Sequence, residues 1–133
     1  MPGYLLDTNI ISALVREPHG KLAQRIARAG ERQVRTNIIV AAELRFGAVR
    51  RNSPRLTMAI ESMLNELVVE PLEPPTDRVY AQLRAKLERD GALIGGDDML
   101  FAAHCMALDC TLVSDNEREF ARVADLRLEN WLR

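Results

Sequence analysis

Short apolar runs alternate along the chain with longer segments whose apolar residues recur at helical spacing. The short runs predict β-strands at residues 4–6, 33–36, 68–72, 110–113 and 126–128. The longer segments predict helices at residues 10–15, 22–29, 38–49, 54–67, 74–89 and 99–108, with a short helical piece after residue 116. Strands that alternate with helices form a mostly parallel sheet with helices on both faces. The pattern therefore predicts an α/β fold.

The composition is that of one soluble globular domain. The 133 residues are 47% hydrophobic and 28% charged, which suits a single domain over residues 1–133 with one core. The first six residues lack the basic start of a signal peptide, and no segment approaches the roughly 18 apolar residues of a membrane span. We therefore expect a cytoplasmic protein without membrane contact. Cys105 and Cys110 are expected to be small packing residues.

The net charge says little about binding partners, so the numbers of lysines and arginines are considered separately. A net charge of -1 argues against a generally basic nucleic-acid binder. Yet of the 18 basic residues only Lys21 and Lys86 are lysine, and the other 16 are arginine. Arginine binds phosphates with paired hydrogen bonds, but a GC-rich genome favours its codons too. Both explanations stay open.

Acidic residues occupy the positions where parallel sheets build their sites. Such sites lie outside the carboxyl ends of the strands, and Asp7 and Asp115 each follow an apolar strand. Asp98 stands at the start of a helix, in Gly-Gly-Asp-Asp. Glu43 interrupts the apolar segment 38–49, which is expected to be mostly buried, and an unpaired carboxylate is costly to bury there. Four acids from four segments are thus expected to converge.

A divalent cation would explain such a cluster of acids. Carboxylates held together repel one another, and an ion that neutralises them keeps the cluster stable. Ligands that are all oxygen indicate Mg²⁺, or Mn²⁺ in its place. His19 and His104 lie far apart in sequence and form no ligand pair, and His104 is expected to pack within its helix.

Each acid also has a simpler interpretation. Asp7 can cap the helix that follows it, and Asp97 or Asp98 can cap the helix that begins near residue 99. Glu43 can face solvent between its apolar neighbours. Asp115 can form a turn together with the following residue.

Five ordered motifs nevertheless resemble one family. They are Tyr4–Ser12, Glu43-Leu44, Ile94–His104, Leu112–Phe120 and Leu128–Trp131. Together they resemble the PIN-domain ribonuclease toxins of the VapC type, which belong to type II toxin-antitoxin systems. The resemblance spans essentially the whole chain.

The resemblance implies a three-layer α/β/α PIN-like domain with a mostly parallel central sheet. It also implies a toxin that acts as a magnesium-dependent endoribonuclease, a hydrolase of RNA phosphodiester bonds, with structured tRNA as the first substrate to test. A cognate antitoxin protein would inhibit it. By their motifs, Asp7, Glu43 and Asp98 are the central catalytic and metal-binding acids. Asp98 rather than Asp97 is the match because it directly precedes the apolar Met99.

The fourth acid departs from the family pattern. Many relatives have an acid where this chain has Asn116, whereas here Asp115 precedes that position and Glu119 follows it. We take Asp115 as the fourth ligand, with Asn116 as a neutral oxygen donor, and expect Glu119 on the exposed side of its short helix. Short polar side chains that can orient carboxylates or contact a phosphate are Thr8, Asn9 and Ser114.

Other functions fit the residues less well. An aspartyl-phosphate hydrolase needs a second acid two residues after Asp7, where this chain has Asn9. A phosphoreceiver domain needs a lysine after a late strand, and neither lysine lies there. A catalytically inactive PIN-like module that binds RNA or protein stays open as an alternative.

Two apolar helical segments predict an interface. Residues 10–15 and 38–49 carry more hydrophobic surface than a core of this size is expected to hide. We expect a homodimer whose grooves accept an antitoxin helix, with a basic antitoxin side chain near Asp7, Glu43 and Asp98.

Overall fold

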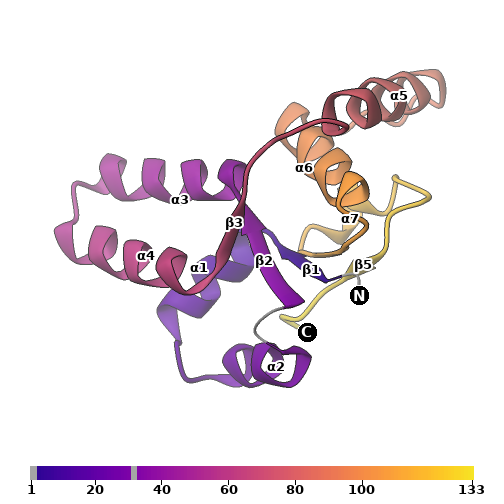
Figure 1. Cartoon of the computed structure of the whole chain (residues 1–133). Helices are drawn as coiled ribbons and strands as arrows, with labels where there is room; N and C mark the ends of the chain where they lie inside the picture. Colours follow the sequence, from indigo (N-terminus) through magenta and orange to yellow (C-terminus); the bar gives the residue numbers. More distant parts are fainter. Residues whose placement is uncertain (1–2, 31–32) are drawn as a thin grey trace.

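The chain folds around a single parallel sheet. A computed structural model describes residues 3–30 and 33–133. Its strands are β1 (Tyr4–Leu6), β2 (Val34–Asn37), β3 (Val68–Glu70), β4 (Thr111–Val113) and β5 (Leu128–Glu129). They lie in the order β3-β2-β1-β4-β5, and all neighbouring pairs are parallel. The central strands β1 and β4 are therefore flanked on both sides by other strands (Figure 1).

Helices cover both faces of this sheet. They are α1 (Thr8–Arg16), α2 (Lys21–Ala29), α3 (Ile38–Arg51), α4 (Pro54–Glu66), α5 (Thr76–Arg89), α6 (Gly96–Ala107) and α7 (Glu117–Phe120). Figure 1 shows α1 to α4 on one side of the strands and α5 to α7 on the other. The three-layer α/β/α architecture predicted from the sequence is thus confirmed.

Local chemistry sets where several helices begin and end. The Asn37 side chain accepts a hydrogen bond from the backbone N–H of Val40 at 3.0 Å and so caps α3. Ser53 caps α4 in the same way, and Pro54 occupies the first helical position, where its missing N–H costs nothing. Gly30 ends α2 with a φ of 95°, which is accessible to glycine at little cost.

The core is centred on β1 and β4. Leu5, Leu6, Leu112 and Val113 are fully buried. The pairing continues one residue beyond β1, because the backbone N–H of Asp7 donates to the carbonyl of Val113, the last residue of β4, at 2.9 Å. This bond holds the polar ends of the two central strands side by side.

A buried polar contact ties α3 to α6. The side chains of Asn37 and His104 lie 2.9 Å apart, between the amide nitrogen and Nδ1, and both are almost completely buried. His104 is therefore a packing residue, as predicted. Cys105 and Cys110 are buried free thiols, which confirms their expected structural role. In the part of the chain that is described, none of the helices combines the length and apolar character needed to cross a membrane.

Three sequence predictions were wrong in detail. The segment 38–49 is not mostly buried, because α3 lies at the surface and exposes Phe46 by 61% and Val49 by 75%. The helix predicted to start near residue 99 starts at Gly96. The last strand is Leu128–Glu129 rather than 126–128, because the register with β4 pairs Leu112 with Leu128.

Candidate active site at the carboxyl ends of the strands

The topology creates a site between β1 and β4. The chain leaves β1 toward β2, whereas it leaves β4 toward β5, on the opposite side of β1. The two connections diverge at this point, and parallel sheets bind ligands in the crevice that such divergence opens. Asp7 and Ser114, the first residues after the two strands, flank this crevice.

Asp7 is held in place from both sides. Ser114 Oγ donates to one carboxylate oxygen of Asp7 at 2.7 Å, and the backbone N–H of Thr8 donates to the other at 2.7 Å. Ser114 is fully buried and also accepts a hydrogen bond from the backbone N–H of Asn116 at 3.0 Å. Asp7 is the N-cap of α1 as well. The capping interpretation and the site interpretation thus describe the same side chain.

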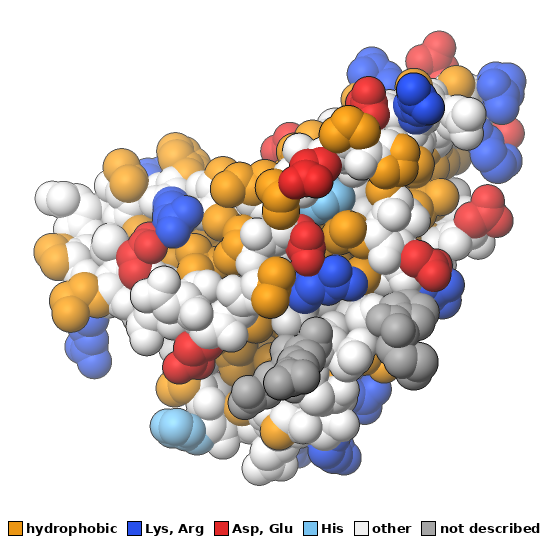
Figure 2. All heavy atoms as spheres, viewed as in Figure 1, with side chains coloured by type: hydrophobic (Ala, Val, Ile, Leu, Met, Phe, Trp, Pro, Cys, Tyr) orange, Lys and Arg blue, Asp and Glu red, His pale blue; other side chains and the backbone are white. Residues whose placement is uncertain are grey.

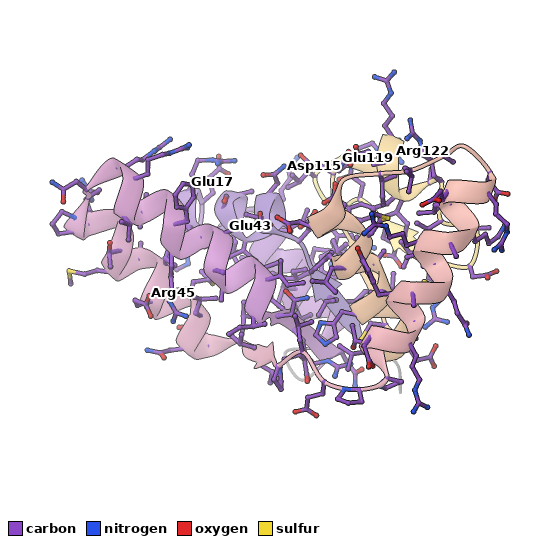
Figure 3. The ribbon with its side chains drawn as sticks, turned by 90° about the horizontal axis from the view of Figure 1, so that it is seen from above. Glu17, Glu43, Arg45, Asp115, Glu119 and Arg122 are labelled. Atoms are coloured by element: carbon purple, nitrogen blue, oxygen red, sulfur yellow. The ribbon has the colours of Figure 1, made fainter. Side chains whose placement is uncertain are left out.

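Glu43 approaches the site from α3. Its side chain is exposed, as the simpler interpretation predicted, and it accepts a hydrogen bond from Thr8 Oγ1 at 2.9 Å. Thr8 follows Asp7 directly, so this bond ties Glu43 to the first acid. In Figure 3 Glu43 extends from α3 toward the segment that carries Asp115 and Glu119.

Asp98 and Glu119 meet through Asn116. The Asn116 amide nitrogen donates to Asp98 at 3.3 Å and to Glu119 at 3.2 Å. Asp98 lies in the first turn of α6, and Gly95 is the N-cap, so neither Asp97 nor Asp98 caps this helix. The expectation that Glu119 lies on an exposed helix face was wrong, because the bend after β4 turns it toward Asn116.

Asp115 occupies the outer rim. Its side chain is exposed and accepts a hydrogen bond from the Asn9 amide at 3.0 Å. The contact joins the segment that follows β1 to the segment that follows β4, and these two segments lie far apart in sequence. Asp115 is therefore more than an isolated turn residue.

These residues line one open hollow, which we call the acidic hollow. Its lining consists of Asp7, Thr8, Asn9, Glu43, Asp98, Asp115 and Asn116. The structure thus brings together every site residue predicted from the sequence, with buried Ser114 beneath. The lining contains carboxylate, amide and hydroxyl groups and no imidazole, thiol or cation.

Crowding of the acids changes their titration. Burial raises the pKa of Asp7, and the charge of Asp115 adds to the rise, although the hydrogen bond from Ser114 opposes it. The pKa of Asp98 is raised to about 7, first by burial and then by the hydrogen bond and charge of Glu119. The charges of Asp7 and Glu43 add smaller contributions. The same contact lowers the pKa of Glu119, so in the metal-free fold the proton of this pair is held by Asp98.

The acidic side chains are not arranged as a metal site in this structure. Within residues 3–30 and 33–133, no three His, Cys, Asp or Glu side chains form a group that could hold a metal ion. Hydrogen bonds from Thr8, Asn9 and Asn116 hold the acids instead. The donors are nonetheless all oxygen, which is the chemistry that Mg²⁺ and Mn²⁺ require.

One participant was not assigned to the site by sequence reasoning. Glu119 was judged exposed because a four-residue helix shows too little periodicity to reveal which face is covered. Its spacing of three residues from Asn116 was the available signal, since residues that far apart share a helix face.

Comparison with known proteins identifies the family. The model of the PIN domain family matches residues 4–126. The ribonuclease VapC2 of Haemophilus influenzae is 37% identical over 131 residues, with 97% of this chain and 98% of that protein covered. The chain belongs to the VapC family of PIN-domain proteins. The family resemblance noted in the sequence is confirmed.

Two further relatives support this membership. A tRNA(fMet)-specific endonuclease VapC from Shigella flexneri is 28% identical, with 96% of this chain and 97% of that protein covered. The crystal structure of VapBC2 from Rickettsia felis bound to a promoter DNA fragment has a chain with a TM-score of 0.88 and 30% identity. That match covers 96% of this chain and 98% of the other. The PIN-like fold therefore extends over nearly all of the VapC-type chain described here.

Proposed function

We propose that this VapC-family chain is the toxin of a type II toxin-antitoxin system, a metal-dependent endoribonuclease that hydrolyses RNA phosphodiester bonds. The observation that carries the proposal is the convergence of Asp7, Glu43, Asp98 and Asp115 on one hollow at the strand ends of a PIN domain. The names of relatives, which are ribonucleases and endonucleases, agree with it.

The acids would hold a divalent cation. Asp7, Glu43 and Asp98 come from different elements and supply the central carboxylates, and Asp115 lines the rim near Asp7. Glu119 is a further candidate because its charge acts directly on Asp98. When bound, Mg²⁺ or Mn²⁺ would polarise the phosphodiester and lower the pKa of a water molecule.

The neighbouring polar groups would fix the acids. Ser114 donates to Asp7 and Thr8 donates to Glu43, so each carboxylate keeps one orientation. Asn116 bridges Asp98 and Glu119, and Asn9 holds Asp115. Because these donors already orient the acids, little reorganisation of the side chains would be needed when a cation and a phosphodiester bind.

The substrate that we propose is RNA, and tRNA is the first class of RNA to test. Support comes from the relatives from Shigella flexneri and Salmonella typhimurium that are named tRNA(fMet)-specific endonucleases. The hollow is open, which suits a polymer that must enter sideways rather than a small molecule that is enclosed.

We also propose two protein partners, a cognate antitoxin and a second copy of the chain. Relatives whose structures were solved as VapBC complexes support the proposal of an antitoxin partner. For the homodimer, the support is exposed apolar surface on the adjoining helices α3 and α4, where Phe46 and Val49 of α3 and Met58 of α4 are all exposed. Figure 2 shows hydrophobic side chains over this end of the molecule. Residues 10–15 cannot contribute much, because Ile10, Ile11 and Leu14 are buried. A strictly monomeric mass by light scattering at tens of micromolar would contradict the dimer.

The decisive test is cleavage by the purified chain. We expect cuts in a tRNA pool with Mg²⁺, mapped as new 5′ ends, loss of the cuts in EDTA, and their recovery with added Mg²⁺ or Mn²⁺. The matched control is Asp7→Asn, prepared in parallel. Cuts that persist in EDTA would contradict the metal-dependent mechanism, and RNA binding without any cutting would indicate an inactive PIN module.

A further inference from the structure

A second depression adjoins the acidic hollow. It lies between α1, α3 and α4, has a volume of about 290 Å³, and shares Thr8 and Glu43 with the hollow. Three arginines line it, Arg16 from α1 and Arg50 and Arg51 from α3. We call it the arginine groove. Any polymer whose reacting bond lies in the hollow must leave it over a neighbouring surface, and this groove is continuous with it.

The three arginines are not paired with any acid among the described residues. Within the described residues, none of them forms a salt bridge or a side-chain hydrogen bond, whereas Arg45 on the same helix pairs with Glu61 at 2.8 Å. Arg50 lies over the Phe46 ring, 5.4 Å from its centroid, which leaves its N–H groups available. The chain carries a net charge of -1, so this cluster is not the result of general basicity.

The position of these residues in their helices accounts for only part of the arrangement. Arg16, Arg50 and Arg51 lie in the last turns of α1 and α3, where a cation is favoured by the helix dipole. The helix dipole explains why each helix ends in a cation. It does not explain why arginines from two helices line the same groove beside an acidic site.

Two acids lie on the opposite side of the hollow. Asp115 and Glu119 lie across from Glu43, with Arg122 beyond Glu119 in Figure 3. The charge of Arg122 acts on Glu119. On the side of the arginine groove, by contrast, none of the three arginines is paired with an acid among the described residues. The charge distribution therefore favours the groove side for the phosphates of a substrate strand.

The floor of the groove allows close approach. Gly47 of α3 lies in it, and a Cβ added at Gly47 would meet no atom within 4 Å. Ser12 of α1 is the other small residue in the lining. The rest of the lining is apolar and consists of Val15, Leu44, Leu56 and Ile60. The open space at Gly47 leaves room for a sugar-phosphate backbone beside the guanidinium groups.

We propose that the arginine groove binds the backbone of the RNA strand next to the scissile phosphate, with Arg16, Arg50 and Arg51 contacting its phosphates. Guanidinium groups bind phosphate through two parallel hydrogen bonds, which sets position as well as affinity. The three arginines are positioning residues, since they act on flanking phosphates and not on the reacting bond. The inference rests on the proposed RNA cleavage and adds the path of the substrate.

Binding is measured in EDTA, so that the result does not depend on cleavage. The probe is a fluorescein-labelled single-stranded RNA of mixed sequence, followed by anisotropy over a range of salt concentrations. The test variant carries Arg16→Gln, Arg50→Gln and Arg51→Gln. The matched control carries Arg78→Gln, Arg84→Gln and Arg89→Gln on α5, which removes the same charge on the other side of the sheet.

The test variant should bind more weakly, with a flatter salt dependence. A single strand loses about 0.7 in the slope of log Kd against log salt for each lost phosphate contact, so three contacts give a change of about 2. The control should keep the wild-type slope. In Mg²⁺ the test variant should raise KM for RNA more than it lowers kcat. Equal slopes for test and control variants would overturn the proposal.

A second pair of variants tests the groove with a single substitution instead of three. Gly47→Glu and Gly47→Gln place side chains of equal size in the groove and differ only in charge. The Glu variant should bind the RNA probe more weakly than the Gln variant. Equal affinity for both, with both folded by circular dichroism, would overturn the electrostatic assignment.

The remaining outcomes separate this inference from the proposed function. If the wild type cuts no RNA in Mg²⁺ but binds it through these arginines, the groove stands and the nuclease proposal fails. If it cuts RNA and the test variant binds and cuts like its control, the groove assignment is wrong. Loss of inhibition by the cognate antitoxin, with RNA binding unchanged, would assign the groove to the protein partner instead.

Discussion

The acidic hollow and the arginine groove share two residues but are built by different means. The hollow depends on backbone that converges at β1 and β4, with its acids held by short hydrogen bonds such as that from Ser114 to Asp7. The groove depends on long side chains from the ends of α1 and α3, and they have no partner among the described side chains. Chemistry requires atoms held within a fraction of an ångström, whereas attraction of a polyanion requires only charge in the right region. The two regions should therefore respond differently to substitution.

The largest expected effect is loss of the central charges of the hollow. Asp7→Asn or Asp98→Asn should lower RNA cleavage by more than about 100-fold, since even outer groups around metal sites cost roughly 10- to 100-fold when removed. RNA binding through the groove should persist. The control is Asp125→Asn, which changes an exposed acid away from the hollow. Initial cleavage rates and anisotropy measure the two properties, and wild-type rates in both variants would mean that the hollow is not the active site.

A smaller effect should rank the outer acids. We expect Glu119→Gln to reduce cleavage by about 10- to 100-fold, and Asp115→Asn by less, on the scale of outer-shell substitutions. The reason is that Glu119 is the neighbour whose charge acts most strongly on Asp98, whereas Asp115 is exposed at the rim. Cleavage rates measured over a Mg²⁺ titration would give the order. A greater loss in Asp115→Asn would place the fourth ligand at Asp115, as the sequence analysis expected.

The two regions should also differ in how pH affects stability without metal. The pKa of Asp98 in the fold is about 7, above its unfolded value of 3.8, so the native state binds more protons between these values. The contribution of Asp98 to stability is thus fully present below pH 3.8 and is lost as the pH rises through about 7. The lowered pKa of Glu119 acts in the opposite direction, but only below its ordinary value of 4.5.

Urea denaturation in EDTA between pH 5 and pH 8 measures this difference. Asp98→Asn should lose less stability than the wild type as the pH rises. Burial lowers the pKa of His104, which acts in the opposite direction in this range but is common to both proteins. The triple arginine variant of the groove should keep the wild-type dependence, because guanidinium groups do not titrate in this range. An equal pH dependence for the wild type and Asp98→Asn would show that the fold does not raise the pKa of Asp98.

The smallest effect concerns the groove alone. Gly47→Ala should raise the free energy of unfolding by about 0.5–1 kcal/mol, because glycine inside a helix costs that much relative to alanine. Space for the methyl group exists, since an added Cβ meets nothing within 4 Å. Chemical denaturation measures the change. A loss of stability would mean that α3 packs more closely at Gly47 than the groove requires.

The sequence by itself determined the alternation of strands and helices, and with it the three-layer α/β/α fold. Apolar runs such as Leu5-Leu6 and Leu112-Val113 are read directly as buried strands, because alternative placements would expose them to water. The rule for parallel sheets then placed Asp7 and Asp115 at the same edge. Periodicity and topology were sufficient for this level of description.

Only the tertiary structure decided which face of each surface element turns toward the site. Helix α3 was expected to be buried but exposes Phe46 and Val49, because apolar composition does not reveal which neighbours exist to cover it. Glu119 is half-buried and accepts a hydrogen bond from Asn116, a contact that the sequence of a four-residue helix does not reveal. The arginine groove was invisible in the sequence, because Arg16 and Arg50 meet only where α1 and α3 end side by side. Local pattern sets secondary structure, whereas contacts between distant segments set the electrostatics of a surface.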